Sequence, residues 1–128
     1  MRLRAAVSAH PIRHLDDVVH QRARLGILAI ANEAHKVDFG CLRESLALTA
    51  GNLSQHLRTL ESAGLVTLEK RIERRRPRTW VSITREGRRA LQREIAALRA
   101  IIERVEEVNS LVITGGDVGD SDGERSAG

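Results

Sequence analysis

The chain has 128 residues, of which 41% are hydrophobic and 30% charged, as expected of one domain with a single core. Its net charge of +4 and isoelectric point near 10.5 favour a polyanionic partner. A single cysteine excludes a disulfide framework, and the chain has neither an apolar run of about 18 residues nor a signal-peptide pattern. We therefore expect a soluble, cytoplasmic protein without a membrane partner.

Three zones of composition divide the chain. Residues 1–15 form a basic lead-in, and residues 16–113 carry the periodic pattern of a folded body. Residues 114–128, TGGDVGDSDGERSAG, contain almost nothing apolar and are predicted to form a disordered acidic tail. Because this tail has four acidic residues against one arginine, the remainder of the chain is more basic than the overall charge indicates.

Two helices are predicted in the first part of the body. Asp16 and Asp17 can cap and charge the start of a helix that runs to about Lys36. Its centre, LGILAIA, is apolar on all sides, which predicts burial on more than one side. A short helix follows in GCLRESL, and three residues share its apolar face: Phe39, Leu42 and Leu46.

A third helix is predicted over residues 49–63, because Thr49 offers a hydroxyl N-cap and Gly64 stands at the C′ position. A helical wheel gives this helix two different sides. The apolar side carries Leu53, Leu57 and Leu60. The opposite side carries only small or polar residues, namely Gly51, Asn52, Gln55, Arg58 and Thr59.

A basic hairpin and a long helix complete the body. Two β-like runs, LVTLEKRI and RTWVSIT, are separated by ERRRP, where Pro77 and the charges favour an exposed turn. Thr84 can then cap a helix from Arg85 to about Val108. An apolar seam with alternating spacings of four and three, typical of coiled-coil a and d positions, follows this helix: Leu91, Ile95, Leu98, Ile102 and Val105.

This order of elements and three motifs resemble the winged helix-turn-helix transcriptional regulators of the ArsR/MarR type. The motifs are the Thr-led third helix, the run LRTLESAGLV, and the TREG that begins the last helix. The resemblance covers roughly residues 16–105. It implies a mainly α fold with a small β-hairpin (α+β), in which the long C-terminal helix forms a dimer. The sequence lacks the cysteine pair of the metal-sensing members of these families.

In such a fold, the polar side of the third helix enters the DNA major groove. Asn52 and Gln55 carry amides that can pair with adenine, and Arg58 can reach guanine or a phosphate. Gly51 allows the backbone to approach the phosphates closely. Four further residues of this helix are expected to contact DNA: Thr49 at its N-terminus, Ser54, His56 and Thr59. The alternative interpretation of this face is a solvated helix surface.

The resemblance also implies that the hairpin, residues 69–80, is a wing that binds phosphates and the minor groove. Its predicted DNA-binding residues are Lys70, Arg71, Arg74, Arg75, Arg76 and Arg78. Trp80 can either stack beside the DNA backbone or cover the base of the hairpin. The predicted dimer interface combines the apolar seam of the last helix with Leu25 and Leu28 of the first helix. The alternative interpretation of the seam is packing against the chain's own domain.

No chemistry of catalysis or metal binding is indicated. The five histidines are scattered without ligand spacing, and Cys41 is a lone thiol. We therefore predict a homodimeric regulator, acting as a repressor, that binds double-stranded DNA and has no enzymatic activity, metal or cofactor. Two alternatives remain, an RNA-binding module and a protein-docking module. The residues do not indicate the operator or any small-molecule effector.

Overall fold

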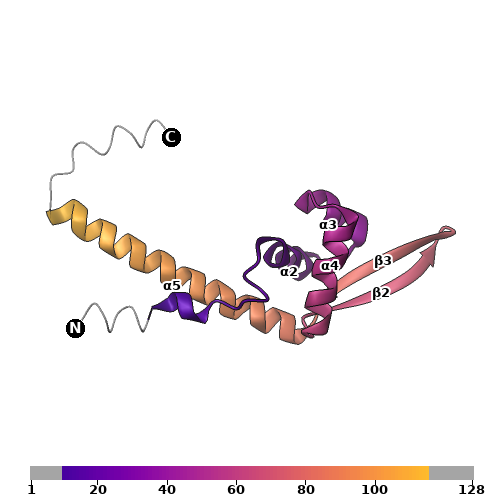
Figure 1. The fold of residues 1–128 in the computed structure, drawn as a ribbon, viewed down its shortest axis with the longest axis horizontal. Helices are drawn as coiled ribbons and strands as arrows, with labels where there is room; N and C mark the ends of the chain where they lie inside the picture. Colours follow the sequence, from indigo (N-terminus) through magenta and orange to yellow (C-terminus); the bar gives the residue numbers. More distant parts are fainter. Residues whose placement is uncertain (1–9, 116–128) are drawn as a thin grey trace.

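The computed structural model describes residues 10–115 and shows the α+β fold that the sequence predicts. Three helices pack beside a small antiparallel sheet, and a long helix extends from them (Figure 1). In chain order the elements are η1 (Pro11–His14), α2 (Arg22–Ala34), β1 (Lys36–Asp38), α3 (Phe39–Leu46), α4 (Ala50–Ser62), β2 (Val66–Glu73), β3 (Arg76–Ile83) and α5 (Arg85–Gly115). None of the described helices has the length and apolar character needed to cross a bilayer.

The core is formed by one face of each helix and the base of the sheet. The leucine side of α4 is buried as predicted, and Ile27 and Leu28 of α2 are fully buried. Further residues of this core are Ala31, Leu42, Val66, Val81, Ala90 and Leu91. The hydrophobic free energy gained by burying these aliphatic side chains is the main contribution that fixes the orientation of α4.

The first helix begins later than the sequence analysis predicts. The carboxylate of Asp16 does act as a cap, since it accepts hydrogen bonds from the backbone N–H groups of Val18 and Val19 at 2.8 and 3.2 Å. These bonds close a turn rather than a helix, and the turn buries Val19 completely. The helix α2 starts at Arg22.

The first helix also ends earlier, and a short strand that the sequence analysis missed follows it. His35 has a φ of 68° and ends α2, so Lys36 belongs to β1 instead of the helix. Strand β1 lies beside β3 and gives the sheet the order β1-β3-β2, with Val37 opposite Val81. At its end, Asp38 caps α3 by accepting a hydrogen bond from the N–H of Cys41 at 2.7 Å.

The hairpin has a tighter turn than ERRRP suggests. Arg74 and Arg75 alone connect the strands, with φ of 54° and 67°, and Pro77 belongs to β3, opposite Ile72. Proline is tolerated there because β1 pairs only with residues 80–82 of β3, so that edge of β3 is unpaired at Pro77.

The last helix starts where the sequence predicts, at a junction that needs a threonine and a glycine. The hydroxyl of Thr84 accepts from the N–H of Gly87 at 2.9 Å and donates to the carbonyl of Gly64 at 2.6 Å. A Cβ at Gly87 would collide with the carbonyl oxygen of Leu65, so only glycine fits. The helix continues beyond Val108 to Gly115, into the predicted tail, and residues 116–128 lie outside the described residues.

The end of the predicted lead-in is part of the folded body. Pro11 is buried and η1 packs against α5, while residues 1–9 lie outside the described residues. A buried carboxylate fixes this segment, because Glu94 of α5 accepts from the N–H of Asp16 at 3.0 Å and pairs with Nδ1 of His20 at 2.9 Å. A buried glutamate is stable only with such partners.

Candidate nucleic-acid interface

The polar side of α4 is exposed, as predicted. The helix begins with the N-cap hydroxyl of Thr49, which accepts from the N–H of Asn52 at 3.1 Å. Gly51, Asn52, Gln55 and Arg58 are exposed, whereas Ser54 and Thr59 are half-buried. The hydroxyl of Thr59 donates to the carbonyl of Gln55 at 3.2 Å. Thr49 and Thr59 are therefore partly used within the helix itself.

Three long polar side chains of α4 are among those without an interaction partner in the described part of the chain. Asn52, Gln55 and Arg58 make no side-chain hydrogen bond or ion pair there. Their amide and guanidinium groups keep their full capacity to donate, and the two amides can also accept. This is the chemistry that recognises base edges in a major groove.

His56 lies at the edge of the polar side, next to α2. Its Nδ1 is 3.5 Å from a guanidinium nitrogen of Arg24, whose Nε donates to the carbonyl of Val18 at 2.6 Å. Partial burial, and secondly the charge of Arg24, lower the pKa of His56 below its usual value. A neutral imidazole can accept a hydrogen bond from the guanidinium.

The strand register divides the wing into two faces, because directly opposed residues of antiparallel strands share a face. The side that we call the outer face carries Glu69, Arg71, Glu73, Arg76, Arg78 and Trp80. The side that we call the inner face carries Leu68, Lys70, Ile72, Pro77, Thr79 and Val81. The inner face is the one turned toward α4, since Leu68, Lys70, Pro77 and Thr79 line a groove with residues of that helix.

Two of the predicted DNA-binding arginines are engaged on the outer face. Arg78 binds Asp38 at 2.7 Å and Glu73 at 3.1 Å, and Arg71 binds Glu69 at 3.0 Å. Hydrogen bonds to these carboxylates raise the pKa of both guanidinium groups above its usual value. A carboxylate beside each arginine also offsets the attraction that it offers to a phosphate.

Trp80 belongs to the same outer network. Its indole Nε1 donates to Glu73 at 3.0 Å, and Lys36 and Arg78 lie 5.1 and 5.2 Å from its ring centroid. These distances allow cation–π attraction. Trp80 is therefore engaged on the outer face by residues of β1, β2 and β3.

The remaining wing cations are not paired in this way. Lys70, Arg74, Arg75 and Arg76 are exposed and have no ion pair with any described residue. Arg74 and Arg75 form the turn at the tip (Figure 1). The free charge of the wing is thus concentrated at its tip and on its inner face.

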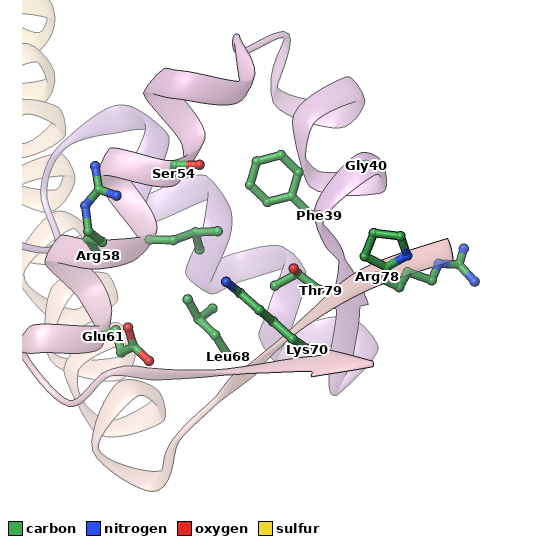
Figure 2. A pocket seen from close by; sticks show the side chains of 11 residues that line it. Phe39, Gly40, Ser54, Arg58, Glu61, Leu68, Lys70, Arg78 and Thr79 are labelled. Carbon is green, nitrogen blue, oxygen red and sulfur yellow. The ribbon is translucent and has the colours of Figure 1, made fainter. Parts of the chain in front are cut away.

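A groove separates α4 from the wing. Figure 2 shows Ser54 and Arg58 on its α4 side, Lys70 and Thr79 on the hairpin side, and Phe39 at the start of α3. Its volume is ≈ 800 Å³. Because the groove lies between the polar side of α4 and the wing, a ligand that touches both must span it. No group of residues suited to holding a metal ion occurs in the described part of the chain.

The residues predicted for a dimer interface lie in two different environments. Leu28 and Leu91 belong to the chain's own core, and Leu25, which is half-buried, packs against it. Along α5, Leu98 is half-buried, whereas the exposed fractions of Ile95, Ile102 and Val105 are 39%, 54% and 53%. Further apolar residues continue this exposed row toward the end of α5, namely Val108, Leu111 and Val112.

Comparison with known proteins agrees with this geometry. A family model described as a winged helix DNA-binding domain matches residues 23–102. An uncharacterised protein of Methanocaldococcus jannaschii is 35% identical over 83 residues, which are 65% of this chain and 90% of that protein.

Solved structures give the same result. The structure of a transcriptional regulator homologue from Pyrococcus horikoshii aligns with a TM-score of 0.65 and 38% identity, covering 69% of this chain and 87% of that one. A MarR family transcriptional regulator from Silicibacter pomeroyi aligns with a TM-score of 0.55 and 22% identity, covering 88% and 80% of the two chains. At this lower identity the likeness concerns the fold alone.

Proposed function

The chain belongs to the family of winged helix DNA-binding domains, and from this premise we propose that it is a homodimeric transcriptional repressor with a specific double-stranded DNA site. The membership confirms the resemblance drawn from the sequence. It also agrees with the expectation that the protein is not an enzyme, since the family is defined by DNA binding.

The observation that carries the proposal is the unpaired polar side of α4. Asn52, Gln55 and Arg58 project from a helix whose opposite side is locked into the core by leucines. A rigid helix with unpaired amides reads base edges at small entropic cost. Arg58, at the border of the groove, can reach a guanine or the adjacent phosphate.

The wing supplies the part of the affinity that does not depend on sequence. Each phosphate that Lys70 or a tip arginine neutralises releases condensed counterions. Ser54 and Thr79 on the walls of the groove can donate hydroxyl hydrogens to the backbone that spans it. This division assigns base reading to α4 and phosphate binding to the groove and the wing tip.

The exposed apolar row of α5 supports the dimer. Ile95, Ile102 and Val105 expose their apolar side chains on the described chain, and α5 extends well beyond the domain (Figure 1). Pairing two copies of the row would bury it and place two α4 helices on one palindromic site, with half-sites about 10 bp apart centre to centre. A dimer bound over a promoter would repress by occluding it.

Two measurements test the proposal. Selection of duplexes from a random pool at two salt concentrations is expected to return one palindromic sequence. Sedimentation of the wild type and of Ile102→Glu is expected to show a dimer and a monomer, because a buried charge in an apolar seam is costly. Recovery of no common sequence, or a wild-type monomer both free and on DNA, would contradict the corresponding part of the proposal.

The RNA-binding alternative finds little support in the side chains. Single-stranded RNA is recognised largely by stacking on exposed aromatic rings. The whole chain has one tryptophan and one phenylalanine. Trp80 is engaged by two cations and Glu73, and Phe39 is packed against the core.

A further inference from the structure

Near its tip, the wing exposes an isoleucine that the fold itself does not use. The exposed fraction of Ile72 is 74%, the highest among the large hydrophobic residues that are exposed in the described part of the chain. Its cross-strand partner, Pro77, is also exposed. Two apolar side chains thus lie together on the inner face, two residues away from the turn.

The pair is the outermost one on the inner face, whose base is apolar and lies in the core. From the base, this row starts with Val66 opposite Ile83 and Leu68 opposite Val81, is interrupted by Lys70 opposite Thr79, and ends with Ile72 opposite Pro77. Burial decreases along this row, from buried at Val66 through half-buried at Leu68 to exposed at Ile72. The helices therefore cover the base of the row and leave its tip to solvent.

On the inner face of the wing and at its turn, the charged side chains are all cationic, whereas the carboxylate of Glu61 lies across the groove on α4. The wing carboxylates, Glu69 and Glu73, lie on the outer face and bind arginines there. Around Ile72, the inner face and the turn contribute Lys70, Arg74 and Arg75, which are exposed and without ion pairs among the described residues. The surface is therefore an apolar spot with a cationic rim, and it suits a partner with apolar groups between anions.

The walls of a DNA groove have this chemistry, since apolar deoxyribose edges lie between phosphates. We propose that Ile72, backed by the ring of Pro77, packs against the deoxyribose wall of the minor groove when the wing is bound to DNA. The inference rests on the proposed function and adds to it a contact that depends on neither base sequence nor counterion release. Apolar side chains are used at the minor groove by several DNA-binding proteins.

The contact predicts a loss of affinity with an unusual salt dependence. Ile72→Ala removes apolar area from the contact, and we expect the Kd for a short mixed-sequence duplex to rise about tenfold. The slope of log Kd against log salt is expected to stay unchanged, because no phosphate contact is lost. Thr67→Ala removes another exposed β-branched residue from the opposite face of β2 and is the matched control, with no expected change.

Two further measurements test whether the contact lies in the minor groove and whether it requires the deoxyribose backbone of DNA. A polyamide that fills the minor groove is expected to abolish the difference between the wild type and Ile72→Ala. On double-stranded RNA, whose minor groove is wide and shallow, the two proteins are expected to bind equally. An equal loss on RNA, or a difference that persists with the polyamide, would overturn the proposal, as would an unchanged Kd on DNA.

Failure of this inference is distinguishable from failure of the proposed function. If the wild type binds the mixed-sequence duplex and Ile72→Ala binds it equally well, only the inner-face contact is wrong. If the wild type does not bind duplex DNA at all, the proposed function itself fails. Thermal unfolding of Ile72→Ala is expected to match the wild type, since the side chain is exposed.

Discussion

The polar side of α4 and the outer face of the wing contain similar donors, but the fold leaves the longest polar side chains of α4 unpaired within the described chain and engages two of the three arginines of the outer face. Asn52, Gln55 and Arg58 of α4 make no side-chain interaction with other described residues. On the outer face, Arg71 and Arg78 bind neighbouring carboxylates. An arginine that is already paired must exchange one anion for another when it meets DNA, so its net gain is smaller. We therefore expect this chain to make fewer DNA contacts than its count of basic residues suggests.

The two arginines at the wing tip are unpaired within the described chain, and they also adopt a backbone conformation that arginine disfavours. Arg74 and Arg75 both have positive φ, which a two-residue turn of type I′ requires. Asn-Gly is favoured there, because residues other than Gly, Asn and Asp cost roughly 1–2 kcal/mol in this conformation. Arginine at both positions therefore lowers the stability of the turn, but it places two unpaired cations at the tip of the hairpin.

The largest effect is expected from removing the unpaired cations. Replacing Arg74, Arg75 and Arg76 together by Ala is expected to weaken binding to every duplex and to flatten the salt slope by up to ~0.9 for each lost phosphate contact. The double variant Arg74→Asn, Arg75→Gly is the control for the turn, since it removes charge but suits the backbone. It is expected to unfold at a higher temperature than the wild type and still bind DNA less tightly. An unchanged salt slope in both variants would show that the tip does not touch phosphate.

The next effect concerns base reading by α4. Asn52→Ala and Gln55→Ala are each expected to cost about 1–3 kcal/mol on the selected site and much less on random DNA. Both side chains are exposed and unpaired within the described chain, so the unfolding temperature is expected to stay the same. The ratio of specific to nonspecific affinity is the quantity to measure. If this ratio is unchanged in both folded variants, α4 does not read the sequence.

Two arginines of the outer face provide a matched pair for a smaller effect. Arg78→Ala breaks the contacts with Asp38 and Glu73, whereas Arg76→Ala removes an arginine that has no ion pair among the described residues. We expect Arg78→Ala to lower the Tm slightly with little change in salt slope, and Arg76→Ala to flatten the slope at constant Tm. Equal slopes for the two variants would mean that pairing within the wing does not limit DNA contact.

Much of this fold was predictable from local patterns. The leucines of α4, the cap of Thr49 and the junction of Thr84 with Gly87 are local signals, and the structure confirms all three. Strand β1 has only three residues and takes its stability from pairing with β3, so its own sequence carries little signal.

The state of each site residue was less predictable, because it depends on partners distant in sequence. Arg78 is engaged by Asp38, 40 residues away, and buried Glu94 is satisfied by His20, 74 residues away. No pattern within the wing or the last helix indicates either pair.

The smallest expected effect concerns His56, which stands between the free and the engaged residues of α4. Burial and the charge of Arg24 lower its pKa in the folded state, so the unfolded chain binds more protons just below the usual histidine pKa. Stability linked to this residue is therefore complete above the unfolded pKa and decreases as the pH falls from there toward the folded pKa. His56→Gln keeps an acceptor for Arg24 but cannot be protonated. Between about pH 8 and about pH 5.5 the Tm of the wild type is expected to fall more than that of the variant. Parallel plots of Tm against pH for the two proteins would show that the contact with Arg24 does not disfavour the charged imidazole. His56 would then count among the free residues on the polar side of α4.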